Sequence, residues 1–167
     1  MRIVQVNNML ERKIIAKKIL AKLPEWFGIP SSTNEYVENS GSLLMWVAYQ
    51  ELETVGFLSL KIHNEFSAEI YVMGVVPIFH KQGIGKLLFQ YAYEWCQNNK
   101  IEYLQVKTLD DSSGDPSYAK TRKFYYSMGF RPLECFKTLW DEWNPCLVMI
   151  QKVESRACTD KNVVLNR

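Results

Sequence analysis

Residues 68–88 read AEIYVMGVVPIFHKQGIGKLL, an apolar and β-branched run that reaches a proline, crosses a short basic turn and enters a helical pattern. The pattern predicts a strand, a tight loop and the first turn of a helix. Gly83 and Gly85 let main-chain N–H groups converge without interference from a Cβ atom. The first turn of a helix leaves further N–H groups unpaired at the positive end of the helix dipole. The sequence therefore predicts an anion site in this loop, most often one for phosphate.

The commoner phosphate-binding loops do not fit these residues. A P-loop carries a glycine five residues before its Gly-Lys pair and a Ser or Thr after it, where this chain has His80 and Leu87. A Rossmann fingerprint needs a third small residue, and Leu88 stands at that place. Both alternatives fail on the chemistry that the missing residues would supply.

Residues 80–85 instead resemble the acetyl-coenzyme A loop of the GNAT family of N-acetyltransferases, whose pattern is Gln or Arg, two residues, Gly, one residue, then Gly or Ala. His80 departs from this pattern at its first position. The resemblance implies that the pantetheine arm binds main-chain groups of the strand and that an amide near Met73 faces the thioester carbonyl. The implied cofactor-binding residues are Met73, Gly74, Val75, His80, Lys81, Gln82, Gly83, Ile84, Gly85 and Lys86.

Two residues are implied as catalytic by the same resemblance. Residues 124–130, Phe-Tyr-Tyr-Ser-Met-Gly-Phe, are similar to the family's Phe-Tyr-x-x-x-Gly-Phe signature, which makes Tyr125 the acid that protonates the departing thiolate. Glu69, in an Ala-Glu-Ile run, resembles the glutamate that takes a proton from the amine in histone-acetylating members, usually through water. The alternatives are a buried structural tyrosine and a strand glutamate paired with a lysine.

The helix that carries Tyr125 departs from the family at two further positions. The family often has asparagine and alanine where this chain has Tyr118 and Thr121. Nearby cations are candidates either for phosphate contacts or for solubilising the helix; they are Lys120, Arg122 and Lys123.

The remaining patterns complete an α/β (α+β) chain. We expect strands at 2–6, 43–50, 54–62, 66–76, 102–108, 130–139 and 146–152, and helices from Met9, up to Glu38, from Ile84 and over 118–128. Alternation places Ala68, Ile70 and Val72 on one face of their strand and Glu69, Tyr71 and Met73 on the other. The resemblance implies a GNAT fold, with a mixed, mostly antiparallel sheet of about six to seven strands, helices on both faces, and a splayed parallel pair formed by 66–76 and 102–108.

Composition sets the class of protein. At 167 residues, with 47% hydrophobic and 13% aromatic residues, the chain fits one globular domain, expected over 1–153 with a tail at 154–167. The net charge of +2 does not favour nucleic-acid binding, and no apolar run approaches the ~20 residues that span a bilayer. Four scattered cysteines and two histidines favour reduced thiols in a cytoplasmic protein over a metal site. Edge strands make a homodimer possible.

These observations favour an enzyme that transfers an acetyl group from acetyl-CoA to a primary amine by direct attack in a ternary complex. Loop aromatics are candidates for a pocket that takes a small molecule; they are Trp26, Phe27, Tyr36, Trp140 and Trp143. The alternatives are a catalytically silent CoA-binding sensor or partner module, and a protein acetyltransferase acting on a lysine or an N-terminus.

Overall fold

The computed structural model describes residues 1–155, so most of the predicted tail lies outside the described residues. The strands, α-helices and short 3-10 helices (η) follow one another in the order β1 (Arg2–Val6), α1 (Met9–Leu20), α2 (Pro30–Ser40), β2 (Leu44–Gln50), β3 (Glu53–Ile62), β4 (Ser67–Val75), η1 (Pro77–Phe79), α3 (Ile84–Asn98), β5 (Tyr103–Leu109), η2 (Asp111–Ser113), α4 (Pro116–Ser127), β6 (Arg131–Asp141) and β7 (Asn144–Lys152).

The strands form one seven-stranded sheet in the order β1-β2-β3-β4-β5-β7-β6. The β4–β5 pair is parallel, and every other neighbouring pair is antiparallel. The parallel pair follows from the crossover through α3, which returns the chain to the end of the sheet where β4 began. The predicted mixed and mostly antiparallel sheet is confirmed.

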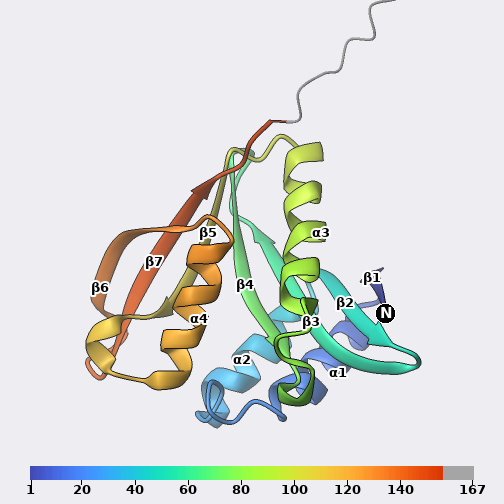
Figure 1. Cartoon of the computed structure of the whole chain (residues 1–167), viewed down its shortest axis with the longest axis horizontal. Helices are drawn as coiled ribbons and strands as arrows, with labels where there is room; N and C mark the ends of the chain where they lie inside the picture. Colours follow the sequence, from blue (N-terminus) through green and yellow to red (C-terminus); the bar gives the residue numbers. More distant parts are fainter. Residues whose placement is uncertain (156–167) are drawn as a thin grey trace, which may run out of the picture.

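Helices cover both faces of the sheet (Figure 1). Ile15, Ile19 and Leu20 of α1 pack with Phe57 in one apolar core, to which α2 adds Val37. On the opposite face, α3 and α4 pack in a second core, where Leu88 of α3 meets the sheet. No helix in the part of the chain that the structure describes combines the length and apolar content needed to cross a membrane.

The helix starts are fixed by residues at their N-termini. The Asn8 side chain accepts a hydrogen bond from the amide of Glu11, and so caps α1. The Asp115 carboxylate accepts from the amides of Ser117 and Tyr118 and caps α4, which begins at Pro116. The α3 helix has no side-chain cap, because its preceding residue is Gly83.

β4 contains a β-bulge at Tyr71. Against β3, Ile70 pairs with Leu60 and Val72 pairs with Ser59, which leaves Tyr71 as an extra residue. The extra residue shifts the alternation by one position. Val72 therefore packs in the core under α1, and Met73 packs in the core under α3.

The prediction of unbroken alternation along this strand is thus wrong at its second half. Ala68 and Ile70 do lie on one face, but Val72 lies on the other face and Met73 takes its place. Side chains alternate between the two faces of a sheet only where the strand has no extra residue relative to its neighbour, and the bulge adds one.

The bulge coincides with the end of parallel pairing. β4 pairs with β5 only from Ser67 to Ile70, opposite Tyr103–Val106, whereas β5 stays paired with β7 as far as Leu109. From residue 71 to 75, β4 keeps β3 as its one neighbour and separates from β5, as Figure 1 shows. The predicted splayed pair is confirmed, and main-chain groups on the open side of β4 face the gap.

Candidate active site

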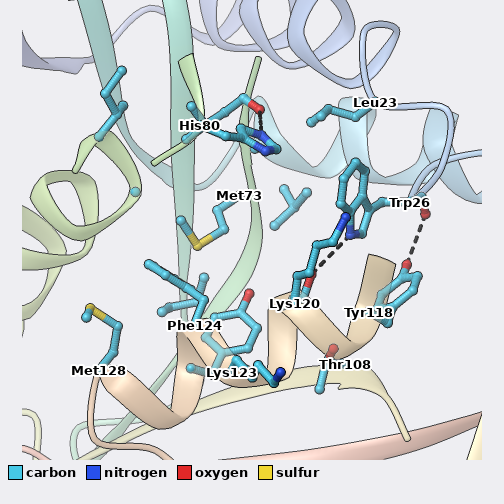
Figure 2. Close-up of a pocket in the computed structure, with 18 of the residues that line it drawn as sticks. Leu23, Trp26, Met73, His80, Thr108, Tyr118, Lys120, Lys123, Phe124 and Met128 are labelled. Atoms are coloured by element: carbon cyan, nitrogen blue, oxygen red, sulfur yellow. Dashed lines mark hydrogen bonds between the residues drawn. The ribbon is translucent and has the colours of Figure 1, made fainter. Parts of the chain in front are cut away.

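A cavity of about 650 Å³ occupies the gap between the separated strands. It is lined by the second half of β4, the loop into α3, the start of α3, the end of β5, much of α4 and the connection between α1 and α2. In Figure 2, His80 and Met73 lie on its β4 side, and Tyr118, Lys120, Lys123 and Phe124 project from α4 on the other.

The loop into α3 presents unpaired amides. In residues 1–155, no acceptor lies within hydrogen-bonding distance of the main-chain N–H groups of residues 81–86. Gly83 takes a left-handed φ of 79°, and a Cβ atom there would meet nothing within 4 Å, so the space above the loop is open. Four lysines that line the cavity add positive charge from the loop and α4, and they are Lys81, Lys86, Lys120 and Lys123. These features make an anion site.

His80 holds the loop to the strand before it. Its Nε2 lies 2.6 Å from the main-chain oxygen of Val75. A carbonyl only accepts, so the imidazole donates from Nε2. The ring also meets the Trp26 indole edge-on, with centroids 6.1 Å apart. The residue that departs from the family pattern therefore has a structural contact within the loop.

All of the predicted cofactor-binding residues except one line the cavity. Gln82 does not line the cavity, and its side-chain amide donates to the main-chain oxygen of Ile78. Gly85 lies where α3 meets α4, since a Cβ atom there would be 3.3 Å from the Phe124 ring. Ile84 contributes main chain to the cavity while its side chain is buried in the core.

Tyr125 lies on the inner side of α4 and lines the cavity. It is 5% exposed, and its ring packs edge-on against Phe124 and Phe130. Burial, with smaller contributions from Tyr118 and Tyr36, raises the pKa of its phenol above the ordinary value. In the described residues its hydroxyl has no hydrogen-bond partner, so a protonated and unengaged phenol borders the cavity.

Glu69 lies beside the cavity rather than on its wall. The side chain is 4% exposed and accepts from Lys107 Nζ at 2.9 and 3.0 Å. Its Oε2 is also 2.7 Å from His63 Nε2 and 3.3 Å from Gln105 Nε2. Lys107 itself lines the cavity. The buried carboxylate and its three donors thus link the cavity wall to the partly exposed His63 ring.

Aromatic side chains from the α1–α2 connection, α2, β4, α4 and β6 form part of the cavity wall. Of the predicted aromatics, four line it, whereas Trp143 is 86% exposed in the β6–β7 turn and does not. Two tyrosines that the sequence did not single out for this pocket join them. We call this set the aromatic chamber, and it consists of Trp26, Phe27, Tyr36, Tyr71, Tyr118 and Trp140.

The two α4 positions that depart from the family bind the α1–α2 connection. The Tyr118 hydroxyl donates to the main-chain oxygen of Trp26 at 3.0 Å, and the Trp26 indole N–H donates to Thr121 Oγ1 at 3.0 Å (Figure 2). Arg122 is buried, donates to the Leu109 oxygen and pairs with Asp111. Arg122 is therefore a structural residue and not a phosphate contact.

Sequence reasoning also missed the end of β5. Lys107 and Thr108 line the cavity, and the Thr108 hydroxyl is buried without a partner among the described residues. The predicted parallel pairing of β4 with β5 could have identified them, because it places these residues opposite the part of β4 that separates from β5. No group of three His, Cys, Asp or Glu side chains within residues 1–155 is placed to hold a metal ion.

Residues 41–132, more than half of the chain, match the family model described as "Acetyltransferase (GNAT) domain". No curated protein matches the chain in sequence. The aminoglycoside 6'-N-acetyltransferase from Enterococcus faecium is similar in structure, with 18% identity, 93% of this chain and 99% of that chain covered, and a TM-score of 0.70. At this identity the likeness concerns the fold.

Two further solved structures share the fold. The ribosomal-protein-S18-alanine N-acetyltransferase from Escherichia coli is 16% identical, with 95% of this chain and 98% of that chain covered and a TM-score of 0.72. A GNAT family acetyltransferase from Elizabethkingia anophelis with acetyl-CoA bound is 19% identical, with coverage of 78% and 87% and a TM-score of 0.61. The fold is thus similar to that of enzymes whose named acceptors differ.

Burial of Tyr36 in the chamber should affect stability at alkaline pH. Burial raises the pKa of its phenol, with smaller effects from Tyr118 and Tyr71. An unfolded tyrosine titrates near pH ~10, so the contribution of Tyr36 to the free energy of unfolding should be fully present below that pH and fall as the pH rises above it. We expect Tyr36→Phe to unfold at nearly the wild-type temperature at neutral pH and to lose less stability in alkali. Thermal unfolding followed across this range tests it, and parallel curves for the two proteins would contradict it.

Proposed function

The chain belongs to the GNAT family of acetyltransferases, and on that premise we propose that it transfers an acetyl group from acetyl-CoA to a primary amine of a small molecule, by direct attack within a ternary complex. One observation carries the proposal. Lys81 and residues 83–86, whose amides are unpaired, border the same cavity as the unengaged phenol of Tyr125, so a site for a diphosphate and a proton donor open into one space.

The residues of the cavity fit coenzyme A. The amides of residues 83–86, flanked by Lys81 and Lys86, would hold the diphosphate. Met73, Gly74 and Val75 would pair with the pantetheine amides, because β5 does not pair with this part of β4. The bound thioester supplies an activated acetyl group. A main-chain N–H near Met73 is suited to stabilise negative charge on its carbonyl oxygen.

Tyr125 is the proposed general acid. Amine attack forms a C–N bond and breaks the C–S bond, so a thiolate leaves and requires a proton. The buried phenol can supply it, because the hydroxyl is protonated at neutral pH, borders the cavity and has no other hydrogen-bond partner among the described residues. The packing of its ring against Phe124 and Phe130 fixes the position of the donor.

Glu69 is the proposed base for the proton that the substrate ammonium must lose before the neutral amine can attack the thioester. It does not line the cavity, so the proton would reach it through water beside Lys107. His63, 2.7 Å from the carboxylate and partly exposed, then offers a path toward solvent. The competing role for Glu69 is to hold Lys107 in place, as the two contacts from Nζ suggest.

The shape of the cavity favours a small molecule over a protein. The aromatic chamber is closed along one side, where Trp26 is hydrogen-bonded to Tyr118 and Thr121 of α4. A protein lysine on an extended peptide needs an open channel, whereas these contacts join the α1–α2 connection to α4 beside the cavity. The similarity in fold does not decide the question, since the named acceptors of the similar enzymes include both kinds.

Replacement of Gly83 by valine should weaken CoA binding by about tenfold or more, because a side chain would occupy the open space above the amides. Gly114 provides a matched control. It has a left-handed φ of 69° and equally open surroundings, but it does not line the cavity. Both valine variants carry similar backbone strain, so calorimetric titration with CoA should separate them. Equal affinities for the two variants would show that the loop is not the diphosphate site.

Loss of the Tyr125 hydroxyl should lower turnover without weakening the binding of CoA. We expect Tyr125→Phe to reduce kcat by about 10²-fold or more and to leave the Kd for CoA unchanged. Tyr126→Phe is the control, since Tyr126 is 43% exposed and does not line the cavity. Turnover equal to that of the wild type in Tyr125→Phe would leave this phenol a structural role.

Two variants separate the roles of Glu69. If the carboxylate is the base, Glu69→Gln should lower kcat by about 10²-fold, and Lys107→Met should lower it much less because the carboxylate remains. If Glu69 serves to place Lys107, the two variants should lose activity alike. Steady-state rates with saturating acetyl-CoA measure the difference, with circular dichroism to confirm that each variant is folded.

A further inference from the structure

The aromatic chamber carries information about the acceptor that goes beyond its being a small molecule. We propose that the acceptor is a small amine with an aromatic ring and a single ammonium group, and that polycations are poor acceptors. This inference rests on the proposed function, because it concerns the second substrate of the same site. It follows from the ring geometry, from the charges around the cavity and from the hydroxyl left unpaired there.

The rings of the chamber stand at steep angles to one another. Phe27 and Tyr36 are 5.7 Å apart with an interplanar angle of 88°, and Tyr36 and Tyr71 are 5.4 Å apart at 62°. Such an arrangement presents both faces and edges, which are the surfaces that a further aromatic ring packs against. A planar ring of the acceptor therefore gains more contact here than a chain of hydroxyl and amino groups.

Hydrogen bonds hold the walls in this arrangement. The Asn39 amide donates to the Tyr71 hydroxyl at 2.7 Å, and Tyr118 and Trp26 are joined through a side-chain to main-chain bond. These walls are thus built before any acceptor arrives, which reduces the conformational entropy lost on binding. The hydroxyls of Tyr71 and Tyr118 are already engaged, so these two walls act mainly as ring surfaces.

The charge of the cavity argues against polycations. Among the described residues that line it there are five lysines and no aspartate or glutamate. Glu69 is the nearest buried carboxylate, and its oxygens already accept from Lys107, His63 and Gln105. Glu35 lies near the Tyr36 and Tyr71 rings but does not line the cavity. A ligand with several ammonium groups would therefore lose hydration at each of them while the lining itself offers no carboxylate.

A single ammonium group can be accommodated. Tyr36 lines the chamber, and its hydroxyl has no hydrogen-bond partner among residues 1–155, so it is available to accept one N–H. The ring faces around it attract one cation through their quadrupoles. The chamber thus provides one acceptor hydroxyl and several ring faces, which matches an amine with one charge and one ring.

A panel of four amines tests the inference with the full chain and acetyl-CoA. The probes are 2-phenylethylamine, its saturated analogue 2-cyclohexylethylamine, 1,5-diaminopentane and kanamycin. Thiol release gives kcat/KM, and the mass of the product confirms N-acetylation. We expect kcat/KM for 2-phenylethylamine to exceed that for the diamine and for kanamycin by about tenfold or more, and to exceed that for the saturated analogue several-fold. A preference for either of the two polycations would overturn the inference.

A pair of tryptophan variants tests the location. Trp140 lines the chamber and is 38% exposed, whereas Trp143 lies in the same hairpin, is 86% exposed and lies outside the cavity. Trp140→Ala should raise KM for 2-phenylethylamine by about tenfold without a change in the Kd for CoA. Trp143→Ala should leave both values unchanged. An unchanged KM in Trp140→Ala would overturn the assignment of the chamber to the acceptor.

Calorimetry separates a failure of this inference from a failure of the proposed function. Protein saturated with CoA is titrated with 2-phenylethylamine and, in parallel, with kanamycin. Tighter binding of 2-phenylethylamine supports the inference even where no amine is acetylated, in which case the proposed catalytic function alone fails. Tighter binding of kanamycin, or no binding of 2-phenylethylamine, overturns the inference while acetyl transfer to another amine still supports the function.

Discussion

A single inserted residue in β4 is the constraint on which the site depends. Tyr71 has no counterpart in β3, and the bulge that it forms turns the rest of the strand by one position and away from β5. Without the bulge, β4 and β5 would continue their parallel ladder and their main-chain groups would pair with each other. With it, those groups face a cavity that reaches both sides of the sheet. The Tyr71 ring also joins the aromatic chamber, so one insertion opens the cavity and furnishes part of its wall.

The cavity combines positive charge with aromatic surface. Its loop presents unpaired amides, and lysines from the loop, α3 and α4 line it, which suits a phosphate-bearing ligand. The lysine of β5 is paired with Glu69, and the aromatic chamber forms another part of the lining. A buried ion pair of this kind is poor evidence of stability, because desolvation offsets much of the attraction. Its position at the cavity wall fits the roles proposed for Glu69, either as the residue that holds Lys107 in place or as the base that takes the proton.

Features that depend on residues close together in the sequence could be predicted, whereas features that depend on contacts between distant segments could not. The anion loop and the Tyr125 signature depend on neighbouring residues, so the sequence displays them directly. The bulge at Tyr71 depends on register against β3, which alternation within one strand cannot reveal. The contact of Trp26 with Thr121 joins residues 95 positions apart. The same limit explains Trp140 and Trp143, two similar aromatics in one hairpin of which only the first faces the cavity.

The placement of Tyr125 shows how the two ends of the site are connected. Its helix, α4, lies close to the start of α3, where a Cβ atom on Gly85 would be 3.3 Å from the Phe124 ring, and Arg122 joins it to the end of β5 by donating to the Leu109 oxygen. On the acceptor side the same helix is bound to Trp26, whose indole also meets the loop histidine His80. The helix that carries the phenol is therefore in contact with residues of both proposed substrate regions. A change in the α1–α2 connection would move the proposed acid as well as the acceptor wall, so acceptor selection and proton donation share one set of contacts.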